Sequence, residues 1–271
     1  MSVNKKKKVL DLIMIVSFLA VLIIFFLFMN YLKDNKENEE IADNLKDLIG
    51  ETVATGGDAT EECGEEEIEY VDFSNILAVN LDFVGWLQIQ DTAIDYPVVY
   101  RPDDTQGSYY YLKRDFYGNS NSGGTLFVDY RNNVREDNNI IIYGHKMRAG
   151  TMFAALLKYE DEEFYKEHKY ISFNTIYGCG TYEVIAAFRT NVKSANSDDF
   201  KYYDYAGNLS AADYEEYVGN CKNLTSYDTA DAEDGERLIT LSTCAYHTYN
   251  GRFVVVAKQI NQKNSYVESE N

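Results

Sequence analysis

Proline, basic side chains and paired cysteines are all scarce in this chain of 271 residues. It contains two prolines, and 25 Lys and Arg residues stand against 44 Asp and Glu, for a net charge of -19. This excess of acid argues against nucleic-acid binding, because contacts to phosphates need clustered Lys and Arg. The four cysteines include no Cys-x-x-Cys pair and the histidines form no cluster, so no metal site is indicated.

Tyrosine, in contrast, is abundant, with 24 residues. Many tyrosines and few prolines suit a compact, β-rich domain better than a disordered chain. About 240 residues lie outside one long apolar run near the N-terminus. At the usual size of roughly 100 to 200 residues per domain, the sequence predicts one sizeable domain.

The N-terminus carries a basic block at residues 5–8, followed by a nearly unbroken apolar run at residues 9–29. About twenty such residues in a helix span a bilayer. The basic block predicts that residues 1–8 are cytoplasmic, that residues 9–30 form a single-pass transmembrane anchor, and that the rest is extracellular. A cleaved signal peptide is the alternative, but its apolar core would be shorter and would end in small residues.

Residues 31–69 predict an acidic stalk between this anchor and the main domain. Apolar residues at near-helical spacing favour a short amphipathic helix at residues 34–49. Residues 50–69 combine low hydrophobicity with dense negative charge, which predicts an extended, disordered spacer that holds the domain away from the bilayer. An ordered acidic surface loop is the alternative. The main domain then covers residues 70–262, and residues 263–271 form a C-terminal tail.

The main domain shows eight short runs of strand-like residues separated by turn signals, which suggests a closed barrel. The expected strands are residues 84–89, 94–100, 125–130, 140–143, 170–174, 182–190, 238–242 and 252–257. The expected helices are residues 73–80, 152–158, 162–167 and 210–222. The longest of these helices starts at an N-cap serine and lies between the sixth and seventh strands.

The last two strands and the fourth carry candidate functional residues. Asn250-Gly251 is a turn signal, so the last two strands form an antiparallel hairpin. This hairpin places Cys244 and Arg252 side by side at one rim of the sheet. A nearby cation favours the reactive thiolate and can stabilise an oxyanion. His145 follows the fourth strand where the backbone leaves the sheet, which is a usual place for a functional side chain.

Three sequence features together resemble the sortase family of cysteine transpeptidases. They are Thr-Leu-Ser-Thr-Cys at residues 240–244, Arg252 on the next strand, and Tyr-Gly-His at residues 143–145. The resemblance covers roughly residues 83–260. The helix between the sixth and seventh strands, the extra N-terminal helices and Asp-Tyr-Arg-Asn at residues 129–132 resemble class B sortases. The resemblance implies a mostly β fold, a closed eight-stranded barrel with N-terminal helices and a helix in the insertion between strands 6 and 7.

Sortases cleave a sorting signal near the C-terminus of a secreted protein, commonly between Thr and Gly. The resemblance implies that Cys244 attacks the Thr carbonyl and forms a thioacyl enzyme. It implies that His145 protonates the leaving amine and then deprotonates the incoming one. Arg252 would hold the oxyanion or position the substrate backbone. No metal or organic cofactor is implied for this chemistry.

The implied partners are secreted proteins with a C-terminal sorting signal, a peptidoglycan-precursor amine as acyl acceptor, and the membrane through the N-terminal helix. By the same resemblance, Tyr143, Ser242 and Thr243 line the substrate groove and Leu112 contacts the apolar residue of the signal. Ala245 departs from the pattern, because some class B members carry an acidic residue at this position.

Other readings of these residues stay open at this point. The enzyme could polymerise pilins, although no lid segment precedes the barrel, or belong to another family of cysteine peptidases. The domain could also be an inactive extracellular binding or scaffolding module. We read His168 as solvated and His247 as a loop residue outside the site. Cys63 has no evident partner, whereas Cys179 and Cys221 could form a disulfide in an extracellular protein.

Overall fold

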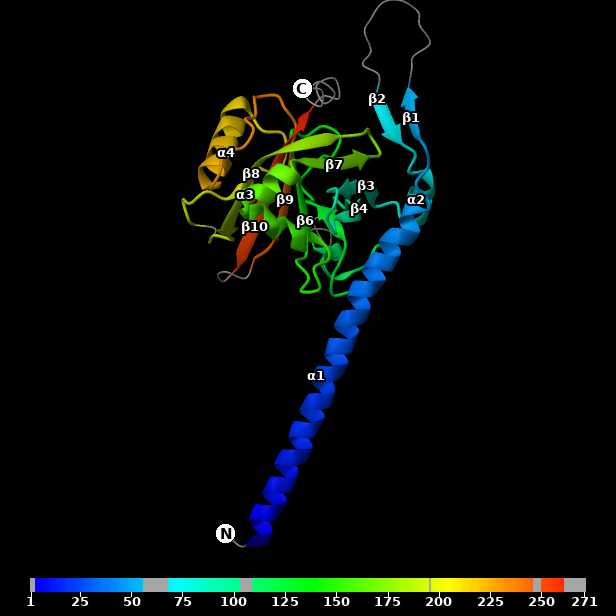
Figure 1. Cartoon of the computed structure of the whole chain (residues 1–271), viewed down its shortest axis with the longest axis vertical. Coiled ribbons are helices and arrows are strands. Elements are labelled where there is room, and N and C mark those ends of the chain that lie inside the picture. Colours follow the sequence, from blue (N-terminus) through cyan, green and yellow to red (C-terminus); the bar gives the residue numbers. More distant parts are fainter. Residues whose placement is uncertain (1–2, 56–67, 103–108, 195, 246–249, 261–271) are drawn as a thin grey trace, which may run out of the picture.

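The computed structural model describes residues 3–55, 68–102, 109–194, 196–245 and 250–260. Its main body is a closed barrel of eight strands in the order β10-β8-β7-β3-β4-β5-β6-β9. The mostly β fold and the closed eight-stranded barrel were both predicted, and both are confirmed. Figure 1 shows the barrel with α4 on one side and the long helix α1 leaving it on the other.

The strands of the barrel follow the expected segments closely. They are β3 (Phe83–Gln88), β4 (Asp95–Val99), β5 (Leu126–Val128), β6 (Asn139–Gly144), β7 (Tyr170–Thr175), β8 (Thr181–Asn191), β9 (Leu238–Cys244) and β10 (Gly251–Ile260). Two further strands, β1 (Thr52–Thr55) and β2 (Ile68–Val71), pair with each other outside the barrel and were not predicted. Residues 56–67 of the expected spacer lie outside the described residues.

The helices sit between the strands or on the outside of the barrel. They are α1 (Val3–Lys46), α2 (Ser74–Val79), α3 (Glu162–Glu167) and α4 (Ala211–Leu224), with the 3-10 helices η1 (Tyr110–Lys113), η2 (Phe153–Glu160) and η3 (Tyr202–Tyr205). Ser210 caps α4 as predicted, because its side chain accepts a hydrogen bond from the backbone N–H of Asp213. The expected helix in the insertion between the sixth and seventh barrel strands is therefore present.

Alternation along the strands divides the buried residues into two clusters. The inward-facing positions, such as Ile140, Ile142 and Leu241, fill the barrel with apolar side chains. The outward-facing Val254 and Val256 of β10 instead pack against α4 in a second cluster. The outer face of β9 and β10 is thus covered along most of its length by the insertion that carries η3 and α4.

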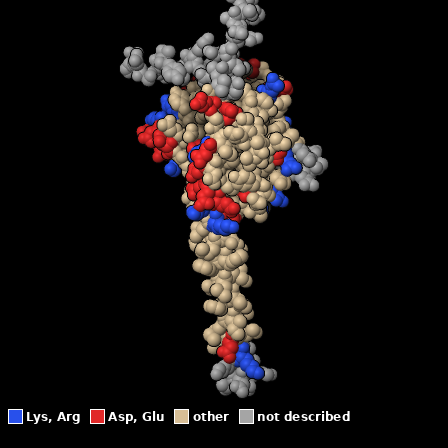
Figure 2. Space-filling view, turned by 90° about the vertical axis from the view of Figure 1, so that its right-hand side faces the viewer, with Lys and Arg blue, Asp and Glu red and all other residues tan. Residues whose placement is uncertain are grey.

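Helix α1 is long and apolar enough to cross a membrane. Residues 12–32 contain no charged side chain and the helix contains neither Gly nor Pro, the usual causes of a kink. Figure 2 shows this stem as an uncharged band with charged residues at its base and where it meets the body. The span expected at residues 9–30 therefore lies within one continuous helix that extends further toward the barrel.

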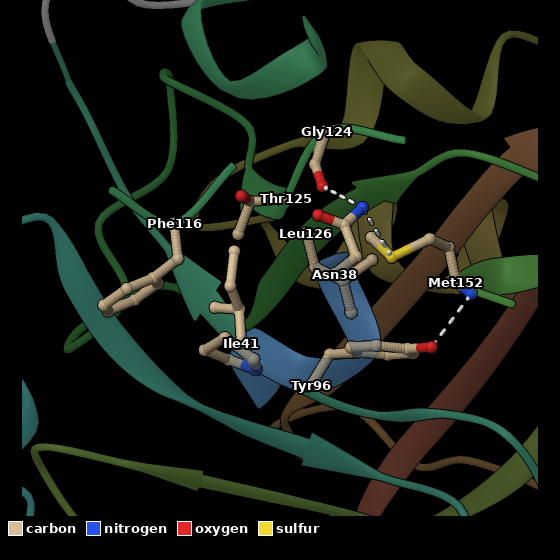
Figure 3. Close-up of a pocket in the computed structure, with 9 residues that line it drawn as sticks. Asn38, Ile41, Tyr96, Phe116, Gly124, Thr125, Leu126 and Met152 are labelled. Atoms are coloured by element: carbon tan, nitrogen blue, oxygen red, sulfur yellow. Dashed lines mark hydrogen bonds between the residues drawn. The ribbon is translucent and has the colours of Figure 1, made fainter. Parts of the chain in front are cut away.

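The last part of α1, residues 31–46, packs onto the barrel, and we call it the docked segment. It buries Ile41, Ala42 and Leu45. Asn38 donates to the carbonyl of Gly124 at 3.1 Å beside a small cavity of about 10 Å³ (Figure 3). Residues 31–46 belong to the expected acidic stalk, and in the structure they continue the helix and contact the domain. The amphipathic helix predicted at residues 34–49 corresponds to this segment.

We expect Leu45→Ala to destabilise the domain by about 2 to 5 kcal/mol, because the side chain is fully buried against the barrel. Asn44→Ala, one residue earlier on the exposed side of the helix, is the matched control and should change the unfolding free energy by less than about 0.5 kcal/mol. Denaturant unfolding of the full chain in detergent measures both. Equal effects of the two substitutions would show that α1 does not pack on the barrel.

Candidate active site

The register of β9 with its two neighbours brings the candidate residues together. On one side, β9 pairs with β10 in antiparallel register, and Cys244 lies directly opposite Arg252. On the other side, β9 pairs with β6 in parallel register, with Tyr143 opposite Ser242 and Gly144 opposite Thr243. His145 and Cys244 are the residues that directly follow this last pair, so the chain directions of β6 and β9 carry both to the same rim. Since residues two apart on a strand share a face, Tyr143, His145, Ser242, Cys244 and Arg252 all belong to one face at one rim.

The thiol and the guanidinium sit in a tight hairpin. Asn250 has a left-handed backbone conformation (φ 55°), which Asn tolerates better than most residues. Arg252 folds back over this turn, and its Nη1 donates to the carbonyl of Gly251 at 3.0 Å and, more weakly, to that of Asn250 at 3.4 Å. Both Cys244 and Arg252 are half-buried, so each is shielded by protein and still open on one side.

His145 is fixed by its neighbours at both the backbone and the ring. Its carbonyl accepts a hydrogen bond from the N–H of Phe153 at 2.9 Å. Gly144 before it is needed for space, because a Cβ there would lie 2.4 Å from Leu126 and 2.6 Å from Phe153. Ring atom Nε2 lies 2.7 Å from the carbonyl oxygen of Leu112. A carbonyl only accepts, so Nε2 carries the proton and Nδ1 of the neutral ring is left as a proton acceptor.

Burial lowers the pKa of His145 below its ordinary value of 6.5. The hydrogen bond to Leu112 opposes this shift, while the positive charges of Lys113 and Arg252 add to it. The imidazole is therefore neutral at physiological pH. The influence of Arg252 on the ring also shows that the guanidinium and the imidazole share one neighbourhood.

A buried carboxylate supports Tyr143 from the neighbouring strand. Asp129 accepts a hydrogen bond from the hydroxyl of Tyr143 at 3.0 Å and two from the guanidinium of Arg131 at 2.8 and 2.9 Å. Burial opposes ionisation of Asp129, but the bonds from Arg131 outweigh it and keep the pKa of the carboxyl below its usual range. Arg131 also donates to the carbonyl of Tyr203 at 2.5 Å, which ties this network to the insertion.

The remaining predicted groove residues lie in different surroundings. Ser242 is buried on the same face as Cys244, and its hydroxyl is 2.7 Å from that of Tyr202 in η3. Burial raises the pKa of Tyr202 to about 12, so it stays a neutral phenol. Thr243 alternates to the inner face, and its buried hydroxyl makes no hydrogen bond to the described residues. Leu112 lies close to the site through its carbonyl group on His145.

The other histidines and cysteines do not join this group. His168, which we expected to be solvated, is partly buried: it stacks on Phe164 with ring centroids 4.0 Å apart and bonds to its carbonyl. No disulfide joins Cys179 to Cys221, so the pairing considered above does not form. Cys63 and His247 lie outside the described residues. Within the described part of the chain, no cluster of three or more His, Cys, Asp or Glu side chains is arranged to hold a metal ion.

Three functional features were missed by reasoning from the sequence. They are the carbonyl of Leu112, the phenol of Tyr202 and the bond between Asp129 and Tyr143. The first two depend on how loops fold back on the barrel. The third, the bond between Asp129 and Tyr143, could have been predicted. Asp129 lies in the Asp-Tyr-Arg-Asn stretch at residues 129–132, and strands that are neighbours in sequence usually pair.

A thiol, an imidazole and a guanidinium on one face at the rim of a closed barrel define the class of the protein, a cysteine enzyme of acyl transfer. A family model described as the sortase domain matches residues 87–260. Sortase B of Listeria monocytogenes is 36% identical over 235 residues, which cover 84% of this chain and 87% of the relative.

Solved structures similar to this chain are also sortases of class B. The crystal structure of sortase B from B. anthracis superposes with a TM-score of 0.66 at 28% identity, over 85% of this chain and all of that one. The Staphylococcus aureus sortase B–substrate complex superposes with a TM-score of 0.60 at 31% identity, over 70% of this chain and 85% of that one. The chain belongs to the sortase family of cysteine transpeptidases, and it is class B-like.

The lowered pKa of His145 gives a pH dependence of stability with a defined sign. The ring of His145 takes up its proton at a higher pH in the unfolded chain than in the folded one. The contribution of His145 to the unfolding free energy is therefore complete above about pH 6.5, and it decreases below this pH as the unfolded ring becomes protonated. Unfolding curves of the wild type and of His145→Gln between about pH 5 and 8 measure this. The stability advantage of the wild type should shrink below pH 6.5, and His168→Gln, the control, should behave like the wild type. An advantage that grows as the pH falls would contradict the neutral ring.

Proposed function

We propose that this protein is a membrane-anchored extracellular sortase that cleaves the C-terminal sorting signal of secreted proteins after a threonine and joins them to a cell-wall amine. The observation that carries the proposal is the shared face of His145, Cys244 and Arg252 on three neighbouring elements. Membership of the sortase family supports the reaction type.

The geometry suggests a role for each side chain. Nδ1 of the neutral His145 accepts the thiol proton of Cys244, and the thiolate attacks the threonine carbonyl. The resulting imidazolium protonates the leaving amine, and the threonine remains as a thioester on Cys244. In the second half, His145 takes a proton from the incoming amine, which displaces the sulfur and forms the new amide bond.

Arg252 supplies positive charge where the carbonyl oxygen becomes an oxyanion. Its present bonds to Gly251 and Asn250 use Nη1 and hold the guanidinium over the turn next to Cys244. The other nitrogens of the fork can then donate to substrate. Tyr143, Ser242 and Leu112 surround the same rim, which supports our assignment of them to the groove. Thr243 supports the groove from behind, since it faces the interior.

The location follows from helix α1. The basic residues 5–8, the apolar run and the single long helix support an anchor with a cytoplasmic N-terminus. An extracellular domain agrees with substrates that are secreted, and a membrane anchor suits an enzyme whose substrates are also held at the membrane. The sequence shows no clear lid segment before the barrel, and this favours wall attachment over pilin polymerisation.

Cleavage of a panel of fluorogenic sorting peptides, with an added amine nucleophile, tests the reaction. Cys244→Ala should lower kcat/KM by about 10³-fold or more, because it removes the nucleophile. Cys179→Ser, at a thiol in a turn between β7 and β8, is the control and should keep wild-type activity. Cleavage that survives Cys244→Ala would refute the mechanism. Product that contains water in place of the added amine would identify a hydrolase.

The role of Arg252 has its own test. Arg252→Ala should lower kcat by about 10²- to 10³-fold, as does the loss of an oxyanion donor, with a smaller change in KM. Arg252→Lys keeps the charge but not the fork, and should recover part of this loss. Lys258→Ala, on the same strand and paired with Glu236 at the other end, is the control. A fall in thermal stability with kcat unchanged would assign Arg252 a structural role only.

A further inference from the structure

The carboxylate of Asp129, directly after β5, is buried and fully bonded. The residue is 5% exposed. Its Oδ1 accepts hydrogen bonds from the backbone N–H of Arg131 at 3.0 Å and from Nε of the same residue at 2.9 Å. Its Oδ2 accepts from Nη2 of Arg131 at 2.8 Å and from the hydroxyl of Tyr143 at 3.0 Å. These bonds use about all of the lone pairs that a carboxylate offers.

The direction of the bond between Asp129 and Tyr143 is fixed by their protonation. Burial disfavours the charge of Asp129, but the bonds from Arg131 keep its pKa below the usual range, so the carboxylate has no proton to donate. Burial raises the pKa of Tyr143 well above its ordinary value, and the charge of Asp129 adds to this, so the phenol keeps its proton. The hydroxyl of Tyr143 therefore gives its one proton to Asp129, and its oxygen can otherwise only accept.

Tyr143 lies on the same face as the thiol. It pairs with Ser242, which is two residues before Cys244 on β9. At about 3.3 Å per residue, two residues of an extended chain span about 7 Å. The ring of Tyr143 packs on that of Phe127 with centroids 5.5 Å apart, and the residue is partly exposed, whereas Asp129 behind it is buried. The hydroxyl oxygen is therefore within the span of a short peptide bound at the thiol.

The neighbouring pair of hydroxyls lacks such a fixed direction. The hydroxyls of Ser242 and Tyr202 lie 2.7 Å apart, and either of them can be the donor. Rotation of these protons adapts the pair to a substrate group that donates or to one that accepts. Tyr143 has no such freedom, because its proton is held by the charge of Asp129. Discrimination between donors and acceptors in a substrate therefore falls to Tyr143.

We propose that Asp129 is a positioning residue that determines specificity: it makes the hydroxyl of Tyr143 an acceptor only, so that the enzyme selects sorting signals that place an N–H against this oxygen. This inference rests on the proposed function and adds a requirement for hydrogen bonding by the substrate. A signal without this N–H leaves the oxygen of Tyr143 without a partner once water is displaced, which costs binding free energy. A signal that places a carbonyl there brings two acceptors together and is rejected more strongly.

The test uses the full chain in detergent and the peptide of the fluorogenic panel that it cleaves best. In a set of analogues, each backbone N–H outside the scissile bond is replaced in turn by an ester oxygen, and each N–H donor of a side chain by an apolar group of similar size. One replacement should lower kcat/KM of the wild type by about 10- to 100-fold, mainly through KM, because it removes the partner of the Tyr143 oxygen.

Two variants assign this loss to the pair. Tyr143→Phe removes the acceptor, so it should cleave the sensitive analogue and the parent peptide with kcat/KM values within about threefold of each other. In Asp129→Asn, Oδ1 can keep its bonds from Arg131 while Nδ2 donates to Tyr143, whose proton is then free for the substrate. The discrimination should therefore fall to about threefold or reverse. Tyr177→Phe, in the turn between β7 and β8, is the matched control and should keep the full discrimination.

A wild type that tolerates every replacement would overturn the inference, and so would a discrimination that persists in Tyr143→Phe. A discrimination that is lost in Tyr143→Phe but kept in Asp129→Asn would remove Asp129 from the selection. Loss of cooperative thermal unfolding in Asp129→Asn would also overturn the inference, because the carboxylate would then act in folding rather than in selection. Failure of the proposed function has a different signature, since the wild type would then cleave no peptide of the panel.

Discussion

The parallel pairing of β6 with β9 is the constraint on which the site depends. This pairing sets Gly144 beside Thr243, and so carries the next residues, His145 and Cys244, to one rim although they are about a hundred positions apart in the chain. The antiparallel pairing of β9 with β10 then adds Arg252 on the other side. A slip of one residue in either register would turn the thiol to the opposite face of the sheet. Fully buried neighbours on the inner face, such as Ile142, Leu241 and Val255, fix the register against such a slip.

The site lies at a seam between the outer face of the barrel and the insertion that carries η3 and α4. Polar groups on this face of β9 are matched one by one by tyrosines: Ser242 by Tyr202, and Thr240 by Tyr217 at 2.6 Å. These bonds satisfy hydroxyls that would otherwise be buried without partners, at a cost of about 1 to 3 kcal/mol each. The series ends before Cys244, which remains half-buried and open to a substrate. Two of the many tyrosines therefore bond to buried hydroxyls next to the site.

The sequence predicted what local pattern controls. Alternating residues and turn signals located all eight barrel strands, and Asn250-Gly251 located the hairpin that pairs Cys244 with Arg252. Pairings between distant strands, such as β6 with β9, follow from the resemblance rather than from local pattern. Alternation could have placed Thr243 on the inner face, since it lies next to Cys244. The partner of His145 was beyond prediction, because a backbone carbonyl is contributed by any residue type and depends only on the path of the loop.

The N-terminal region shows how composition can mislead about rigidity. Residues 31–46 are rich in charge, and a charged segment after an apolar run suggests a solvated stalk. Their apolar residues are few, but Ile41, Ala42 and Leu45 fall on one face of the helix and are all buried. Two asparagines on the same face, Asn35 and Asn38, are buried as well and bond to the barrel loops. A composition average hides this face because the charged residues on the rest of the helix are averaged together with it.

The same two loops contact both the imidazole of His145 and helix α1. The excursion from Leu112 to Gly124 provides the carbonyl that selects the tautomer of His145 at one end and binds Asn38 at the other. The loop after His145 binds Tyr31 through Arg148 and Ala149 before it enters η2. A displacement of the docked segment would therefore pull on the supports of the imidazole as well as on the position of the barrel. In the proposed mechanism His145 is a general base, and general-base geometry tolerates only small errors in distance. The packing of α1 on the barrel and the alignment of this ring are therefore parts of one structural unit.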